Sequence, residues 1–242
     1  MSPEEICLVF RFKDETVKDF DRFIDNNFRY CSCFVALDDR SAANDNLEKV
    51  SRHPQCAALI RKNQPFTELF DNCDHEMLYT AAKTTGKKWI LALDIDEILD
   101  RRFAEEMTSL PDKKPCIWFP FHYMYPDESH YIVEGIYANR FFPCLFRMNA
   151  EMCHATLLES RIHASRVPDY SLHRGRVDKK WYHSAIRAAS PIYHFSMCSE
   201  QQRRRRFEFY TKYDPGNKVQ KEGYGHILAE HPHAALLPDI VR

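Results

Sequence analysis

The chain has 242 residues, of which 44% are hydrophobic, 34 are basic, 35 are acidic and only six are glycine. A single domain of this length can bury a hydrophobic core. No apolar run approaches about 18 residues, which excludes a membrane-spanning helix, and the net charge of −1 argues against nonspecific nucleic-acid binding. The six glycines form neither G-x-G-x-x-G nor G-x-x-x-x-G-K-[ST], so any bound nucleotide is held without a glycine-rich phosphate loop.

The front of the chain alternates short apolar runs with helical patterns. Strands are expected at 6–10, 33–37, 57–60 and 89–93, where apolar residues follow one another without a break. Helices are expected at 17–28, 47–50 and 69–81, where apolar residues recur at helical spacing. Strands that are apolar on both faces and alternate with helices predict an α/β fold with a mostly parallel central sheet flanked by helices.

The pattern changes from residue 116 onward. Aromatic residues crowd between 118 and 146, and residues 150–195 indicate mixed strands and loops that contain several histidines. A basic amphipathic helix is expected at about 200–213, docked by Phe207, Phe209 and Tyr210. Because no repeat, low-complexity stretch or long linker divides the chain, we expect a single domain over 1–242 with halves at about 1–115 and 116–242.

The nine cysteines favour unpaired thiols over a disulfide framework. Their count is odd and no C-x-x-C pair occurs. Cys31 and Cys33 are spaced closely enough for a metal pair, but no matching second pair follows. The first residues are acidic and polar, unlike a signal peptide, so a cytoplasmic location is expected.

Acidic clusters follow two of the four expected strands. Asp38 and Asp39 end the second strand, and Asp94, Asp96 and Glu97 follow the fourth. Ligands of open α/β sheets bind beyond the carboxyl ends of the strands, and carboxylates at i and i+2 can converge on one divalent cation. Such a cation would offset the charge of a diphosphate without a glycine loop. The alternative is that Asp96 or Glu97 caps a following helix.

Residues 89–99 resemble the W-I-L-x-L-D-x-D-E signature of family-2-like glycosyltransferases with the GT-A fold, in the subgroup with a D-x-D-E segment. The segments 35–41, 145–147 and 191–195 are similar to that family's V-D-D-x-S, L-F-R and late H-Y segments, in the same order. The departure is Arg40, where the family usually has glycine or asparagine. The resemblance implies a hexosyl- or pentosyltransferase, with its nucleotide-binding half at about 1–115 and its acceptor half and C-terminal helical segment at about 116–242.

The resemblance also implies roles for individual residues. Asp39 would recognise the base, and the loop that ends at Glu15 would lie beside it. Asp94 would approach the ribose or the metal, while Asp96 and His194 would be metal ligands. The implied cofactor is Mn²⁺, or Mg²⁺, and the implied partners are a nucleotide-sugar donor, with a UDP-sugar foremost, and a glycan or other hydroxyl acceptor.

An inverting transfer needs a carboxylate that takes the proton of the attacking hydroxyl. Glu159 lies about where the family places its acidic residue and is the expected catalytic base. His163 is the histidine expected to line the acceptor pocket, and the aromatic stretch 118–137 offers stacking faces for sugar rings. The competing carboxylates are Asp127, Glu128, Glu134 and Asp169.

Two other functions are compatible with the sequence. A strand followed by D-x-D also begins haloacid-dehalogenase-like phosphatases, in which Asp94 would be the nucleophile. The chain would also fit a non-catalytic carbohydrate-binding protein on the same fold.

The arginine run 203–206 points in several directions on a helix, so it forms no single patch. One of these arginines can reach a diphosphate, and the others suit solvent or a peripheral membrane contact.

Overall fold

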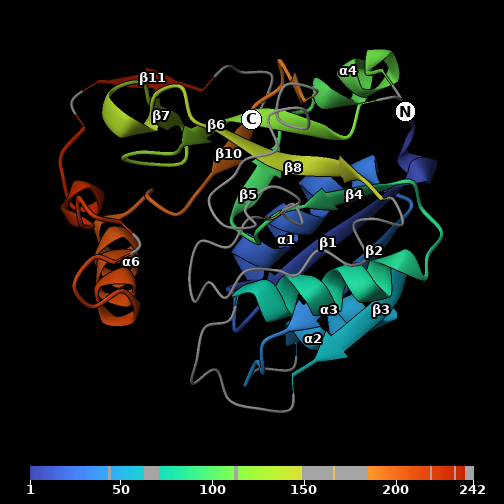
Figure 1. Cartoon of the computed structure of the whole chain (residues 1–242). Coiled ribbons are helices and arrows are strands. Elements are labelled where there is room, and N and C mark those ends of the chain that lie inside the picture. The colour runs from blue at the N-terminus through green and yellow to red at the C-terminus, as the bar shows by residue number, and fades with distance from the viewer. Residues whose placement is uncertain are drawn as a thin grey trace.

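A computed structural model describes residues 1–42, 45–62, 71–111, 114–148, 166, 185–218, 220–231 and 233–237. Within these residues the chain forms a curved mixed sheet with helices on both faces (Figure 1). None of the described helices has the length and apolar character needed to cross a membrane.

The front half follows the predicted order of elements. It consists of β1 Ile6–Phe12, α1 Val17–Asn27, β2 Cys33–Asp38, α2 Asp45–Arg52, β3 Cys56–Arg61, α3 Asp71–Lys83 and β4 Trp89–Ala92, with short 3₁₀ turns at Pro3–Glu5 and Phe28–Tyr30. The four strands pair in parallel in the order β3-β2-β1-β4. The chain therefore reverses its direction of travel across the sheet at β1, which is where α/β proteins bind ligands.

The back half extends the same sheet with mixed parallel and antiparallel pairings and adds a separate two-stranded sheet. Its elements are β5 Glu97–Leu99, α4 Phe103–Ser109, β6 Cys116–Tyr123, β7 His130–Ile132, η3 Gly135–Tyr137, β8 Phe141–Arg147, β9 Ile186–Arg187, β10 Ile192–His194, α6 Glu200–Tyr213, η6 Gly225–Ile227 and β11 Ala234–Leu236. β8 pairs antiparallel with β4 and β6, whereas β10 pairs parallel with β6 and antiparallel with β5. Most pairings of the described central sheet are parallel, as predicted.

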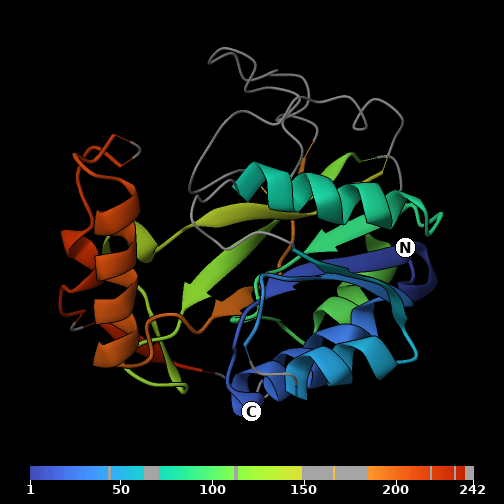
Figure 2. The ribbon, with the colours of Figure 1, turned by 90° about the horizontal axis from the view of Figure 1, so that it is seen from below.

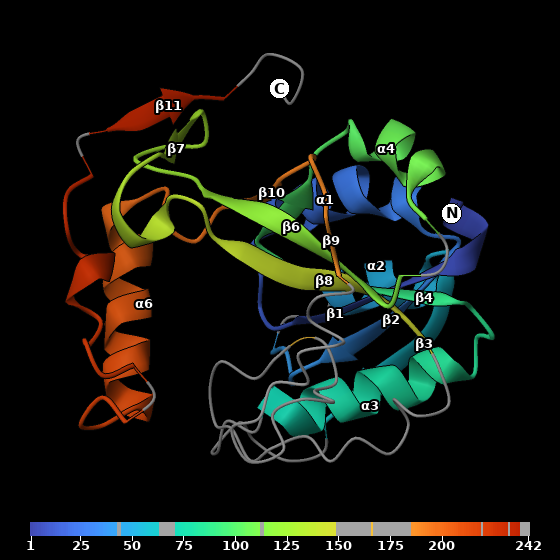
Figure 3. The same cartoon turned by 45° about the horizontal axis from the view of Figure 1, so that its top comes forward.

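The central strands β1, β2 and β4 are buried on both faces because almost all of their residues are apolar. Successive side chains of a strand point to opposite faces, so Leu8 and Phe10 of β1 enter one core and Cys7 and Val9 enter the other. Helices α1, α2 and α4 cover the first core, and α3 covers the second (Figures 2 and 3). The α/β class and the flanking helices are thus confirmed.

Helix α6 occupies the predicted positions and stands beside the central sheet (Figure 1). Its first turn is fixed by a capping box, in which Ser199 and Gln202 bond to each other's backbone N–H groups. Phe207 and Tyr210 pack against a small cluster around Tyr224, as expected. Phe209 was expected to dock as well, but it is 37% exposed, because it lies on the opposite side of the helix.

Candidate functional site

A tight turn after β4 places the acidic segment at the carboxyl edge of the sheet. The Glu97 N–H donates to the Asp94 carbonyl at 3.0 Å, which closes the turn, and the chain then returns as β5. Glu97 therefore begins a strand, and the next helix starts only at Phe103. The alternative in which Asp96 or Glu97 caps a following helix is wrong.

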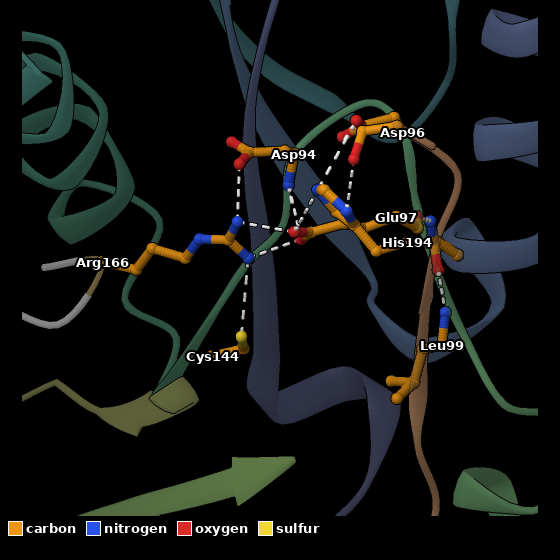
Figure 4. Close-up of polar contacts among 9 residues, drawn as sticks. Asp94, Asp96, Glu97, Leu99, Cys144, Arg166 and His194 are labelled. Carbon is orange, nitrogen blue, oxygen red and sulfur yellow. Dashed lines mark hydrogen bonds and ion pairs between the residues drawn. The ribbon is translucent and has the colours of Figure 1, made fainter. Parts of the chain in front are cut away.

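The pairing of β5 with β10 brings Glu97 and His194 side by side. They are register partners in this antiparallel pair, and the Phe195 N–H donates to the Asp96 carbonyl at 2.8 Å. The ligand atoms of Asp96, Glu97 and His194 all lie within 4.8 Å of one another. His194 Nε2 is 3.5 Å from Asp96 Oδ2 and 3.7 Å from Glu97 Oε1 (Figure 4). Three side chains with metal-ligating atoms thus converge on one point.

The His194 ring has the protonation state that a metal ligand needs. Burial lowers the pKa of His194 to about 4, in spite of the Asp96 carboxylate nearby, so the ring is neutral at pH 7. Its Nδ1 lies 2.8 Å from Ser196 Oγ, and Arg206 donates to the same hydroxyl. A neutral imidazole between two carboxylates is a donor set that suits a hard or borderline divalent cation.

Arg166 binds the other half of the acidic segment. Its guanidinium donates to Asp94 Oδ2 at 2.5 Å and to both carboxylate oxygens of Glu97, with Cys144 Sγ beside it (Figure 4). Burial by itself would raise the pKa of Asp94, but Arg166 and Arg11 hold it well below its usual range. Burial raises the pKa of Glu97 to about 7 even with Arg166 in contact. Sequence reasoning missed Arg166, because it is one of five arginines among residues 150–195 and belongs to no motif.

A buried amide fixes the strand that carries Glu97. Asn27, at the end of α1, is fully buried; its amide donates to the Glu97 carbonyl at 2.8 Å and accepts from the Leu99 N–H at 3.0 Å. These two bonds occupy the free edge of β5 and hold the turn against α1. Asn27 was also missed, since its position at the end of an amphipathic helix resembles an ordinary polar helix end.

Asp39 lies in a chain of ion pairs at the end of β2. Its carboxylate is 3.0 Å from Lys62 Nζ, which also lies 2.6 Å from Asp74. The neighbouring Asp38 is fully buried; it accepts from the Ser41 N–H at 2.8 Å and pairs with Arg61 at 3.1 Å. The structure thus places Asp39 on the same sheet edge as Asp94, while its expected contact with a base stays a prediction.

Arg40 has a left-handed backbone with φ of 61°. Glycine adopts this conformation freely and asparagine adopts it readily. These are the two residues usual at this position in the family that the segment 35–41 resembles. We expect Arg40→Gly to raise the free energy of unfolding by about 0.5–1 kcal/mol, after the entropy of the more flexible unfolded chain is deducted. Urea unfolding measures this change in the free energy of unfolding. Arg40→Ala keeps a side chain at the left-handed position, so it should not raise the stability. Equal stabilisation by both variants would show that the backbone is not the cause.

Glu15 lies within electrostatic reach of the acidic turn. It is half-buried, and the Asn46 amide donates to its carbonyl at 2.8 Å. Burial, and then the charge of Asp96, raises the pKa of the Glu15 carboxyl to about 7. The Glu15 carboxyl thus interacts electrostatically with Asp96 of the candidate metal-binding cluster, while its expected place beside the base stays a prediction.

This raised pKa predicts a pH-dependent stability. An acid with a folded pKa above its ordinary value of 4.5 stabilises the fold below that value, and the stability is lost as pH rises to about 7. Relative to Glu15→Gln, the wild type should lose about 2 kcal/mol between about pH 5 and pH 7.5 after allowance for partial exposure. Urea unfolding at the two pH values, with the exposed Glu105→Gln as control, measures this loss. Parallel pH profiles of the wild type and Glu15→Gln would refute it.

The expected catalytic base and acceptor histidine lie outside the described residues. This holds for Glu159 and His163, and also for the competing Asp169. Of the other competitors, Glu128 pairs with Lys18 at 2.8 Å and Asp127 contacts His130 at 3.0 Å. Glu134 accepts from the His233 N–H at 3.3 Å. The partners of these three carboxylates lie outside the acidic turn, and a role for any of them as the catalytic base stays a prediction.

The arginines of the α6 run point in different directions, as predicted. Arg203 stacks over the ring of Tyr125 at 4.8 Å, Arg204 pairs with Glu200 at 2.6 Å, and Arg205 is exposed. Only Arg206 turns toward the site, where it donates to Ser196 next to His194. One arginine of the run thus contacts the support of the candidate metal-binding cluster, and the run forms no single patch.

No protein-family model and no curated protein sequence matches this chain. Solved structures with some similarity include S. aureus TarS 1–349 in complex with UDP-GlcNAc, at 10% identity and a TM-score of 0.48, covering 94% of this chain and 71% of that one. The inositol-1-phosphate CTP transferase from T. maritima has 10% identity and a TM-score of 0.45, covering 88% of this chain and 98% of that one. At these values the description of the fold rests on the chain's own topology.

Proposed function

We propose that this chain is a divalent-cation-dependent glycosyltransferase that moves a sugar from a nucleoside-diphosphate donor, with a UDP-sugar foremost, to a hydroxyl of a glycan or related acceptor with inversion. The observation that supports this best is the convergence of Asp96, Glu97 and His194 at the carboxyl edge of the sheet. Asp96 and Glu97 belong to the D-x-D-E segment that resembles the family-2-like signature, and His194 meets them from β10, beside the point where the strand order reverses.

The donor set suits Mn²⁺ or Mg²⁺, which when bound would neutralise charge on the diphosphate. Asp96 is the ligand open to solvent, since its side chain is 36% exposed, whereas Glu97 is fully buried. Ser196 and Arg206 would hold the His194 ring in place. Asp94, engaged by Arg166, is proposed to contact the ribose or the metal.

The nucleotide would lie at the sheet edge between β2 and β4. Asp39 would accept from the base, and Glu15 would lie beside the nucleotide on the loop after β1. Arg11 lies at the end of β1 and lines a small cavity with Asp94 and Arg166, which provides positive charge near the expected diphosphate. Cationic side chains and a bound cation would together replace the missing glycine loop.

Transfer with inversion requires a base on the acceptor side, and Glu159 remains our proposal for it. The carboxylate would take the proton of the acceptor hydroxyl as that oxygen attacks the anomeric carbon. His163 is proposed to contact the acceptor. The aromatic residues of β6 that pack against His194, such as Tyr123 at 5.0 Å, would border the sugar.

The experiment is a donor panel. The purified chain is incubated with MnCl₂ and UDP-, GDP-, CDP- and dTDP-sugars, and nucleotide release is followed with and without EDTA. Release from one donor that EDTA abolishes would support the proposal. Phosphate release from p-nitrophenyl phosphate would favour the phosphatase alternative, in which Asp94 is the nucleophile. Binding of a nucleotide sugar without turnover by any acceptor would favour the carbohydrate-binding alternative, and no nucleotide binding at all would refute all nucleotide-based roles.

A further inference from the structure

Two cysteines face each other at the amino-terminal edge of the sheet, opposite the candidate site. Cys7 of β1 and Cys33 of β2 are register partners in a parallel pair. Neighbouring strands lie about 4.8 Å apart, and disulfides span Cα separations of about 4.4–6.8 Å. The backbone therefore already holds these two residues within disulfide range.

Their side chains share one face of the sheet but differ in access. Both contribute to the core beneath α3, where Cys7 is fully buried and Cys33 packs at the margin. Cys33 is half-buried, so a small solute reaches its sulfur first. Cys31, on the same edge, is buried in the other core. The geometry thus provides one accessible thiol with a protected thiol directly behind it.

The surroundings of Cys33 favour its thiolate. The contact with Cys7, the nearby Lys87 ammonium, and hydroxyls of Thr85 and Ser32 hold the pKa of Cys33 at about 6, against the effect of burial. The same contact and burial raise the pKa of Cys7 well above its ordinary value. A reactive thiolate beside a protonated partner is the arrangement of redox-sensitive cysteine pairs.

We propose that Cys33 and Cys7 form a peroxide-oxidisable pair that closes reversibly to a disulfide. The Cys33 thiolate attacks hydrogen peroxide; an S–O bond forms, the O–O bond breaks, and hydroxide leaves. The Cys7 sulfur then attacks the Cys33 sulfenic acid; an S–S bond forms, the S–O bond breaks, and the departing hydroxide takes the Cys7 proton as water. The hydroxide from the first step takes up the proton that Cys33 released on ionising, so two thiols and one peroxide give one disulfide and two waters, with two electrons passing to the peroxide.

The oxidised pair should be easy to reduce. Side chains of register partners in a parallel pair project side by side, so bond formation must draw the two strands' Cβ atoms together. A strained disulfide has a higher reduction potential, which suits a reversible modification and not a permanent structural link. The pair is independent of the proposed glycosyl transfer, because it lies at the opposite edge of the sheet.

The test treats the full reduced chain with one equivalent of hydrogen peroxide at neutral pH, followed by alkylation of the remaining thiols and peptide mapping by mass spectrometry. We expect loss of two thiols, a linked Cys7–Cys33 peptide, and full recovery with dithiothreitol. Cys33→Ser should abolish the link. Cys73→Ser, which removes an exposed thiol on α3, should leave it unchanged.

A second measurement separates reactivity from folding. In Cys7→Ala the Cys33 sulfenic acid has no resolving thiol, so dimedone should label Cys33 at all times in this variant, whereas in the wild type it should label Cys33 only before the disulfide has closed. If Cys7→Ala fails to fold, the wild type quenched with dimedone at early times provides the same evidence. Faster oxidation of Cys73 than of Cys33, or a Cys31–Cys33 link in place of Cys7–Cys33, would overturn the proposal.

Discussion

Replacing Asp96 with asparagine is expected to lower donor turnover by at least about 10³-fold, equivalent to about 4 kcal/mol of transition-state stabilisation. Asp96 is the most exposed of the three candidate metal ligands, so an incoming cation would reach its carboxylate first. Mn²⁺ affinity, read by electron paramagnetic resonance, should fall in parallel by about 10-fold or more.

Folding should not account for this loss. Asp96 is partly exposed and faces like charges such as Glu15, so its neutralisation should leave the melting temperature unchanged or slightly higher. Asp25→Asn, an exposed change on α1, is the matched control and should retain turnover and Mn²⁺ binding. Wild-type turnover and Mn²⁺ affinity in Asp96→Asn would refute the metal assignment.

Replacing Arg166 with glutamine should destabilise the fold by about 3–5 kcal/mol, because it leaves two carboxylates without their shared cation. Glu97 is fully buried, and Arg166 normally lowers its pKa, so the variant's Glu97 should titrate above about 7. An acid with a raised folded pKa stabilises the fold at low pH and loses that stability as pH rises through the folded pKa. The loss in Arg166→Gln should therefore be larger at about pH 8 than at about pH 5.

Urea unfolding at both pH values measures this effect. Arg205→Gln removes an exposed arginine of α6 and should change stability by no more than about 0.5 kcal/mol. Added Mn²⁺ should restore part of the stability of Arg166→Gln, since a cation at Asp96, Glu97 and His194 compensates the same buried charge. A loss below about 1 kcal/mol that is the same at both pH values would show that Arg166 is not the counter-ion of Glu97.

Local pattern was sufficient where a residue's environment depends on its neighbours in sequence. The apolar runs that became β1, β2 and β4 needed no tertiary information, because strands buried on both faces must be apolar at every position. The same holds for α6, whose capping residues Ser199 and Gln202 lie three apart. The acidic turn was also readable, since Asp94 and Asp96 directly follow a buried strand.

Which residues meet in the candidate site depends on strand pairings and long-range contacts that the sequence pattern does not predict. Glu97 and His194 meet only because β5 runs antiparallel to β10 in one register, and a shift by one residue would turn their side chains to opposite faces. Arg166 and Asn27 reach the same turn from distant parts of the chain. The pairing of Cys7 with Cys33 likewise follows from strand register.

The sequence by itself thus determined the α/β class, the order of the front elements and the acidic turn at the carboxyl edge, all of which follow from short-range hydrophobic pattern. Only the tertiary structure decided that Glu97 joins Asp96 and His194, that Arg166 holds Asp94, and that Cys33 lies beside Cys7. The physical reason is that these contacts are set by register and by long-range packing, which composition and periodicity do not encode.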